Sequence, residues 1–284
     1  MSRAAGLLPG AVARLRAAGV ADPGRDARLL LAHALRVGAE RLTLHMDDTV
    51  APAAQARFER AVAARARRQP LAQITGRRLF WGREFRVTPD VLDPRPETET
   101  LIAAALERRY ARVLDLGTGS GAILLTLLAE RAQATGVGCD ISDPALAVAR
   151  ANAQALGLDA RATFLRSDWF AAVDGRFDLI VSNPPYVSAP EHADLAPDVR
   201  DWEPRGALVP VGDAGDGLAD YRRIVAGAAA YLTPGGALLL EIGATQAPAV
   251  TEALRTAGFG EIVTAPDMDG RPRVVGGRLD RALP

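Results

Sequence analysis

Lysine is missing from this sequence, and cysteine and histidine are scarce. All 34 positions counted as Lys or Arg are arginine, and 34 Asp and Glu residues balance them to a formal net charge of zero. Proteins that bind long nucleic acids usually carry a basic surplus, so we expect no stable nucleic-acid binding. The one cysteine, Cys139, cannot form an internal disulfide, which favours a reducing compartment. The histidines are scattered without metal-ligand spacing, and we expect no metal site.

Long apolar runs are absent as well. Near the start, Pro9, Arg14 and Arg16 interrupt the apolar stretches. A signal peptide needs an unbroken apolar centre, and a membrane span needs about 18 or more apolar residues. We therefore expect a cytoplasmic protein without a membrane segment. The composition, 49% hydrophobic and 24% charged, is that of a folded protein, and 284 residues favour two domains.

The first part of the chain reads as helical. Residues 1–75 are rich in alanine, and Asp22 before Pro23 is a typical helix start. Residues 52–68 predict a further helix with an arginine face, which is either a solvated surface or a docking surface for an acidic partner. Residues 76–96 predict a hairpin and a linker. We expect a helical domain over 1–75 and a second domain over 97–284.

Strands and helices alternate after residue 110. Arg112–Leu116 predicts a buried strand, and further strands are expected near 136–141, 163–165, 177–181 and 237–242, with two strand-like runs beyond 260. Helical segments separate most of them, which predicts an α/β fold with a parallel sheet covered on both faces. Ligands of such sheets bind beyond the carboxyl ends of the strands.

A glycine-rich turn follows the first of these strands. In Gly117-Thr118-Gly119-Ser120-Gly121, alternate glycines let the backbone turn tightly and approach a ligand. Asp140 ends the next strand, where a carboxylate can accept both hydroxyls of a ribose. Asp168 and Trp169 end the third strand. Asp168 could accept a hydrogen bond from an adenine amino group while Trp169 packs on the base. Equally, the two could be a turn aspartate beside a core tryptophan.

The fourth strand ends in Asn183-Pro184-Pro185-Tyr186. The prolines cannot continue a ladder, so they fix the backbone and leave carbonyls free as acceptors. Asn183 adds a side-chain carbonyl, and Tyr186 adds an aromatic face. Such acceptors suit a planar amino group whose nitrogen attacks a cationic centre.

These motifs together resemble the release-factor glutamine N5-methyltransferases (HemK/PrmC family), whose N-P-P-Y motif is shared with DNA and RNA amino-methyltransferases. The likeness is most specific in Pro94-Arg95-Pro96-Glu97-Thr98-Glu99, and it extends from about residue 20 to 278. The resemblance implies a small helical domain that docks the substrate, followed by a seven-stranded Rossmann-like class I methyltransferase domain with its last strand antiparallel.

The implied reaction moves a methyl group from S-adenosyl-L-methionine, leaving S-adenosyl-L-homocysteine, to the glutamine amide of the Gly-Gly-Gln motif in peptide-chain release factors. The resemblance also implies which residues serve each part of the site. The catalytic residues would be Asn183, Pro184 and Tyr186. The cofactor would contact Gly117, Thr118, Gly119, Ser120, Gly121, Asp140, Asp168, Trp169 and Asn183. The substrate would contact Asn183, Pro184, Pro185 and Tyr186.

Three rival interpretations stay open at this point. A DNA or RNA amino-methyltransferase would use the same N-P-P-Y pocket, although the neutral charge argues against it. A dinucleotide oxidoreductase would have the spacing G-x-G-x-x-G and would leave Asn183 to Tyr186 unexplained. A non-catalytic binding module would tolerate loss of the cofactor loop or of the amide site, and both are present.

Overall fold

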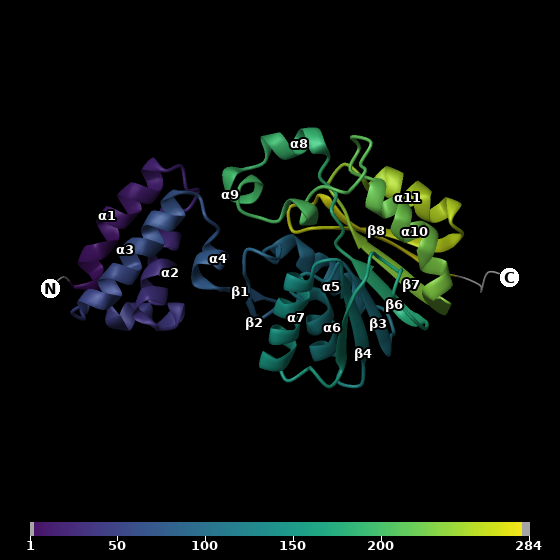
Figure 1. Cartoon of the computed structure of the whole chain (residues 1–284), viewed down its shortest axis with the longest axis horizontal. Coiled ribbons are helices and arrows are strands. Elements are labelled where there is room, and N and C mark those ends of the chain that lie inside the picture. The colour runs from purple at the N-terminus through teal and green to yellow at the C-terminus, as the bar shows by residue number, and fades with distance from the viewer. Residues whose placement is uncertain (1–2, 280–284) are drawn as a thin grey trace. The chain divides into compact units, whose positions relative to one another are not determined.

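The computed structural model describes residues 3–279 and divides into two compact units (Figure 1). The helical unit contains the chain up to Arg77 and also the short segment Ala196–Trp202. The sheet unit contains Arg78–Leu195 and the chain from Glu203 onward. The chain therefore passes between the units at three places, namely 77/78, 195/196 and 202/203. No helix within the described residues has the length and apolar character needed to span a membrane.

The helical unit is built from short helices around one apolar core. Leu15, Leu30 and Phe58 are fully buried in it. The expected start at Asp22 is confirmed, since its side chain accepts a hydrogen bond from the Arg25 amide at 3.0 Å. The elements are α1 (Ala4–Ala17), α2 (Pro23–Leu35), η1 (Ala39–His45), α3 (Pro52–Ala66), α4 (Leu71–Thr75) and, from the later segment, α9 (Pro197–Arg200).

Ion pairs and hydrogen bonds hold the segment Ala196–Trp202 within this unit. Arg65, only 8% exposed, donates to Asp26 at 2.7 Å and to Asp198 at 3.0 Å. Arg68 also pairs with Asp198, which keeps the pKa of that carboxyl below its usual range. Trp202 donates its indole N–H to the backbone carbonyl of Arg67, just after α3, at 3.2 Å. Part of the predicted arginine face thus serves an internal contact.

The sheet unit contains seven strands in the order β5-β4-β3-β6-β7-β9-β8 (Figure 1). Neighbours from β5 to β7 run parallel, whereas β9, the last strand, is antiparallel to both β7 and β8. This confirms the seven-stranded methyltransferase fold expected from the sequence. The strands are β3 (Arg112–Leu116), β4 (Thr135–Asp140), β5 (Ala162–Arg166), β6 (Phe177–Ser182), β7 (Leu232–Glu241), β8 (Phe259–Pro266) and β9 (Pro272–Leu279).

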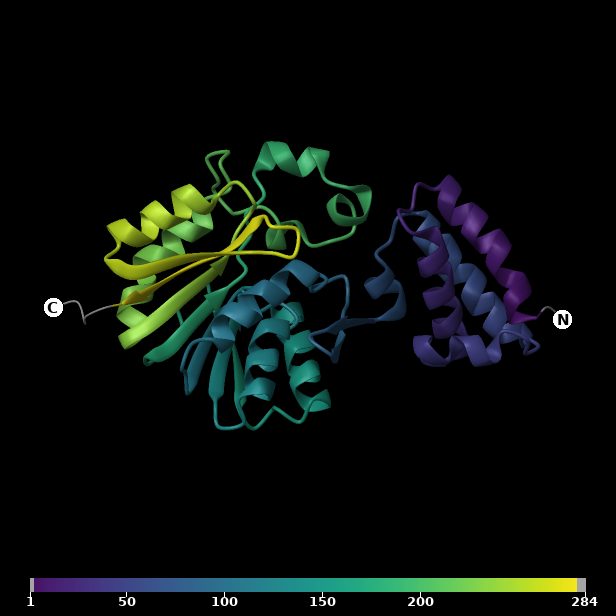
Figure 2. The same cartoon turned by 180° about the vertical axis from the view of Figure 1, so that it is seen from behind.

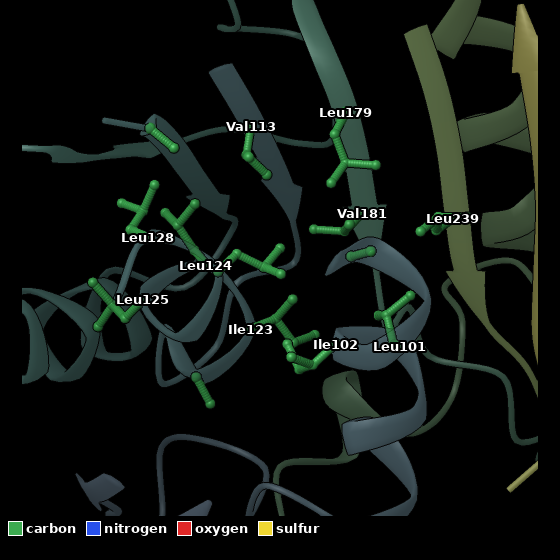
Figure 3. Close-up of a cluster of buried hydrophobic side chains, with 14 of the residues drawn as sticks. Leu101, Ile102, Val113, Ile123, Leu124, Leu125, Leu128, Leu179, Val181 and Leu239 are labelled. Atoms are coloured by element: carbon green, nitrogen blue, oxygen red, sulfur yellow. The ribbon is translucent and has the colours of Figure 1, made fainter. Parts of the chain in front are cut away.

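Apolar side chains alternate along the central strands because successive residues of a strand point to opposite faces of the sheet. Val113 joins a core cluster beneath α5 (Glu99–Leu106) and α6 (Ala122–Glu130) (Figure 3). Its neighbour Leu114 joins a second cluster beneath α10 (Ala219–Tyr231) and α11 (Ala247–Thr256). Helices accordingly cover both faces, as the two opposite views show (Figures 1 and 2). This burial on both faces explains the nearly continuous apolar runs that predicted buried strands.

Helices and a hairpin complete the sheet unit. The expected hairpin is present as β1 (Arg77–Phe80) and β2 (Arg83–Arg86). The chain continues from Pro96 as the short turn η2 (Pro96–Thr98) and then as α5 (Glu99–Leu106). The remaining helices are α6 (Ala122–Glu130), α7 (Asp143–Ala155), α8 (Ala189–Asp194), η3 (Arg205–Ala207), α10 (Ala219–Tyr231) and α11 (Ala247–Thr256). The sequence patterns had not indicated α8 or α10.

Candidate active site

A cavity of about 360 Å³ opens in the sheet unit at the carboxyl ends of the parallel strands. The chain folds so that the turns after β3, β4, β5 and β6 all contribute to its lining. Most of the predicted site residues line this cavity, namely Gly117, Thr118, Gly119, Ser120, Asp140, Asp168, Trp169, Asn183 and Pro185. Gly121, Pro184 and Tyr186 are not among the lining residues. Motifs that are far apart in sequence thus converge on one space.

The glycine-rich turn has a backbone that requires glycine. Gly117, Gly119 and Gly121 all have positive φ, at 70°, 54° and 79°. The amides of Gly117 and Thr118 both donate to the Cys139 carbonyl at 2.9 Å, which ties the turn to β4. A Cβ atom on Gly119 would meet no described atom within 4 Å, so the turn borders open space. The turn is therefore a preformed backbone cradle at the cavity wall.

Asp115, near the end of β3 and just before this turn, has a structural role. It is fully buried, and its carboxylate accepts a hydrogen bond from the Thr118 hydroxyl at 2.6 Å. Burial raises the pKa of Asp115 to about 7, although the Thr118 hydrogen bond opposes this shift. The side chain holds the turn from behind and does not line the cavity.

Asp140 lies at the end of β4 with its carboxylate held in place by backbone amides. One oxygen accepts from Gly119 N and the other from Ser142 N, both at 2.9 Å. Burial raises the pKa of Asp140, whereas these hydrogen bonds lower it. Each carboxylate oxygen has a further lone pair, and the residue lines the cavity. Asp140 can therefore accept hydrogen bonds from a pair of ligand hydroxyls.

Asp168 and Trp169 lie on the turn after β5. Asp168 is half-exposed and its carboxylate forms an ion pair with Arg223 at 2.7 Å. Trp169 has a φ of 50°, and its indole ring lies against Gly117, where a Cβ would come 3.5 Å from the ring. The indole N–H donates to Asp220 at 3.2 Å. The structure thus gives both side chains protein partners as well as a place in the cavity wall.

Asn183 follows β6 directly, beside the end of β7. The last paired residues of these strands are Ser182 and Leu240, and the Ser182 hydroxyl donates to the Leu116 carbonyl at 2.7 Å. The side-chain amide of Asn183 donates from Nδ2 to the Thr98 hydroxyl at 3.4 Å. Asn183 is thereby presented to the cavity by a fixed backbone and a buried partner.

The rest of the Asn183–Tyr186 motif is less open to the cavity. Pro184 is buried, and the Tyr186 ring packs at the edge of the second core cluster, next to Gly243. The Tyr186 carbonyl accepts from the Gln246 side chain at 3.0 Å. Burial raises the pKa of Tyr186 to about 12, so its hydroxyl is neutral at ordinary pH. The packing of the Tyr186 ring against the core therefore anchors the motif.

Several lining or supporting residues were not singled out from the sequence. Ile141 follows Asp140 and lines the cavity while 63% exposed, an apolar surface suited to a flat ring. The signal in the sequence was the position of Ile141 directly after Asp140, the acid that ends β4. Thr98, 4% exposed, accepts the hydrogen bond from Asn183, and Glu241, 1% exposed, follows Leu240, the residue of β7 that pairs with Ser182. Thr98 and Asn183 had no common local signal because they are distant in sequence.

Family comparisons agree with this geometry. Residues 7–76 match the model of the PrmC N-terminal domain, and residues 93–198 match the methyltransferase small domain. A release factor glutamine methyltransferase of Cereibacter sphaeroides is 59% identical over 280 residues, which cover 99% of this chain and all of that protein.

Solved structures share the fold. A methyltransferase from Pyrococcus furiosus is similar with a TM-score of 0.54 and 17% identity, over 80% of this chain and 98% of that one. The 16S rRNA N2 G1207 methyltransferase (RsmC) of T. thermophilus, solved with AdoMet and guanosine, has a TM-score of 0.50 and 26% identity. That match covers 71% of this chain and 49% of RsmC.

Proposed function

This chain belongs to the release factor glutamine methyltransferases, and from that membership we propose that it methylates the side-chain amide nitrogen N5 of the glutamine in the Gly-Gly-Gln motif of peptide-chain release factors. The observation that carries the proposal is that Asp140 and Asn183 line one cavity. The Asp140 carboxylate is suited to the hydroxyls of a ribose, and the Asn183 side chain is suited to an amide. A release-factor substrate agrees with the cytoplasmic location expected from the sequence.

The residues of the cavity fit S-adenosyl-L-methionine. Asp140 offers two oriented oxygens for ribose hydroxyls, and Ile141 and Trp169 offer apolar surface for an adenine. The turn Gly117–Gly121 offers a close approach of backbone to the amino-acid end. Asp168 would contact the adenine amino group only in competition with Arg223. When bound, the cofactor supplies an electrophilic methyl group on a sulfonium.

The part of the cavity that would bind the substrate amide is proposed to work by orienting that amide. The Asn183 Oδ1 and the Pro184 carbonyl would accept hydrogen bonds from the two N–H groups of the substrate amide. This draws the nitrogen lone pair out of conjugation and directs it toward the sulfonium. Pro185 keeps the backbone rigid, and the Tyr186 ring would hold the amide and favour the positive charge. Fixed dipoles in the cavity stabilise the charge that develops during transfer.

The helical domain expected over residues 1–75 is proposed to dock the release factor. Its match to the PrmC N-terminal domain supports this role. Binding energy from a remote contact can orient the reacting amide. A short Gly-Gly-Gln peptide should therefore be methylated with a much lower kcat/KM than the whole factor, and equal values would refute docking.

Labelled S-adenosylmethionine tests the proposed function. The protein is incubated with a release factor, with a factor variant whose motif glutamine is replaced by asparagine, with DNA and with RNA. Label on the intact factor alone is the expected result. Label on the asparagine variant would refute the assigned position, and label on DNA or RNA without label on the factor would favour a nucleic-acid amino-methyltransferase.

A further inference from the structure

A glutamine side chain holds the far end of the Asn183–Tyr186 motif. Gln246, the residue before α11, donates from Nε2 to the Tyr186 backbone carbonyl at 3.0 Å. Its Oε1 accepts a hydrogen bond from the Gly243 amide at 3.0 Å, and its own backbone amide donates to the Gly243 carbonyl at 3.0 Å. One half-buried side-chain amide therefore connects the motif to the turn between β7 and α11.

The neighbours of Gln246 fix which end of its side-chain amide faces the motif. A backbone N–H can only donate, so the Gly243 amide must face the side-chain oxygen. A backbone carbonyl can only accept, so the Tyr186 carbonyl must face the side-chain nitrogen. The reverse orientation would set donor against donor and acceptor against acceptor. The contact therefore requires one donor and one acceptor on the same planar group, which glutamine provides and an ionised glutamate does not.

Two glycines leave room for this contact. Gly217 has a φ of 68°, and a Cβ atom there would overlap the Tyr186 carbonyl oxygen and lie 2.9 Å from the Gln246 Nε2. A Cβ atom on Gly243 would lie 2.9 Å from the Gln246 Oε1. A side chain at either position would thus displace the hydrogen-bonded groups. The backbone on both sides of Gln246 accommodates its amide only because it carries no side chain at these points.

The motif needs a contact of this kind because the two prolines after Asn183 have no N–H group. They cannot donate to a neighbouring strand, and a proline ring fixes φ but leaves ψ free. At the near end of the motif, Ser182 is still paired with β7. At the far end, the hydrogen bond from Gln246 fixes the peptide plane that follows Tyr186. The backbone between these two ends carries the Asn183 side chain and the Pro184 carbonyl.

We propose that Gln246 is a positioning residue for methyl transfer, which fixes the backbone of Asn183–Tyr186 so that its acceptors and its aromatic ring meet the substrate amide in one geometry. The inference rests on the proposed function, because these are the groups that would bind the glutamine amide. Gln246 does not line the cavity and would act only through the motif. Its loss should therefore reduce the rate of the chemical step, which depends steeply on the placement of reacting groups.

Gln246→Glu tests the donor alone. The carboxylate keeps the length of the side chain and can still accept from Gly243, but it sets a second acceptor against the Tyr186 carbonyl. At about pH 8.5, where the carboxyl is ionised, kcat should be roughly 10-fold to 100-fold below that of wild type. Single-turnover assays with saturating release factor measure it. Cofactor affinity from calorimetry should change less than kcat, because Asp140 and the glycine-rich turn are untouched.

Protonation should rescue this variant. A protonated carboxyl carries one donor and one acceptor, as the glutamine amide does, and can again donate to the Tyr186 carbonyl. The ratio of the variant's kcat to that of wild type should therefore rise as the pH falls from about 8.5 to about 5.5. The ratio corrects for the charged and titratable groups around the contact, which both enzymes share. They are Arg95, Glu97, Tyr186, Asp213, Asp216, Tyr221, Arg222, Glu241 and Arg273.

Two further variants serve as controls. In Gln246→Met the side chain keeps a similar length but neither titrates nor forms these hydrogen bonds, so its kcat should be low at every pH. Gln154→Glu adds the same charge at an exposed position on α7, outside the cavity lining, and should keep the wild-type rate. Melting temperatures at each pH show that the enzymes remain folded.

The outcomes separate the proposal from a purely structural role. Folded Gln246→Glu and Gln246→Met enzymes that turn over as fast as Gln154→Glu would overturn it. A kcat ratio for Gln246→Glu that responds to pH no more than that of Gln246→Met would also overturn it, because lost packing alone is not restored by a proton. A wild-type enzyme that leaves the release factor unmethylated would overturn the proposed function instead.

Discussion

The two sides of the cavity hold their key side chains by different means. On the side of β4, Asp140 is fixed by two backbone amides, and the adjoining turn owes its shape to three glycines with positive φ. On the side of β6, Asn183 is held through a side-chain hydrogen bond to the buried Thr98 hydroxyl. Little on the backbone side can rotate, although burial raises the pKa of two of its carboxyl groups, Asp115 and Asp140. On the side of β6 the Thr98 hydroxyl can rotate, so the contact that holds Asn183 is the more adaptable of the two.

Asn183→Ala should have the largest effect. It removes the amide oxygen on the side of β6, and kcat should fall roughly 10²-fold or more, as happens when a preorganised polar group is lost from a closed site. Cofactor affinity should fall less than kcat, because the turn and Asp140 are untouched. Single-turnover kinetics and calorimetry measure the two quantities. A folded Asn183→Ala enzyme that turns over at nearly the wild-type rate would contradict the division between the two sides.

Asp140→Ala should give the converse result. Loss of the carboxylate should weaken cofactor binding by about 1–3 kcal/mol, the range for charge-assisted hydrogen bonds. The rate at saturating cofactor should fall less than in Asn183→Ala. Asp143→Ala is a matched control, because Asp143 is exposed at the start of α7 and does not line the cavity. An affinity unchanged by Asp140→Ala in titration calorimetry would remove this residue from the cofactor site.

Glu241 should leave a signature in the pH dependence of stability. Its folded pKa, about 7, lies above its ordinary value of 4.5, so between these pH values the folded state holds more protons on this group than the unfolded state. Its contribution to the free energy of unfolding therefore decreases as the pH rises through that window. Relative to wild type, Glu241→Gln should gain on the order of 2–3 kcal/mol between the two ends of the window. Urea titrations at both ends measure it, and a constant difference would contradict the shift.

Gly117→Ala should have the smallest effect of the set. A φ of 70° strains any residue with a Cβ, at a cost of about 1 kcal/mol, and the added methyl would also touch the Trp169 ring. Cofactor affinity and melting temperature should both decrease slightly. Gly157→Ala is a suitable control, because Gly157 has a similar φ of 67° on the turn after α7. If both variants lower the melting temperature and neither lowers cofactor affinity, Gly117 has no specific role in cofactor binding.

Much of the site could be predicted because its signals are local. The glycine spacing of the turn, the acid that ends β4 and the prolines after Asn183 each report a backbone constraint within a few residues. The contact between Asn183 and Thr98 could not be predicted in this way. Thr98 lies 85 positions before Asn183, so nothing in the sequence around either residue indicates the contact.

The fold shows the same division between local and distant information. Strands buried on both faces have apolar runs that are visible in the sequence, so β3, β4 and β6 were expected close to their true positions. The short helices after β6 lie among prolines and aspartates, which favour turns as much as helix starts. That Ala196–Trp202 packs with the helical unit depends on Asp198 meeting Arg65 and Arg68, which are 133 and 130 positions away.

The discontinuous make-up of the helical unit limits how the protein can be cut and recombined. A truncated chain that begins after residue 77 would keep Ala196–Trp202 without α3, so the Asp198 carboxylate would lose both of its arginine partners and Trp202 its backbone acceptor. Conversely, an isolated N-terminal fragment would lack Asp198. Arg65 would keep its buried ion pair with Asp26 but lose its second carboxylate partner. Grafting the helical unit of a relative onto this chain would therefore require exchange of both segments together. In evolution, substitutions at 65, 68 and 198 are then expected to occur in concert.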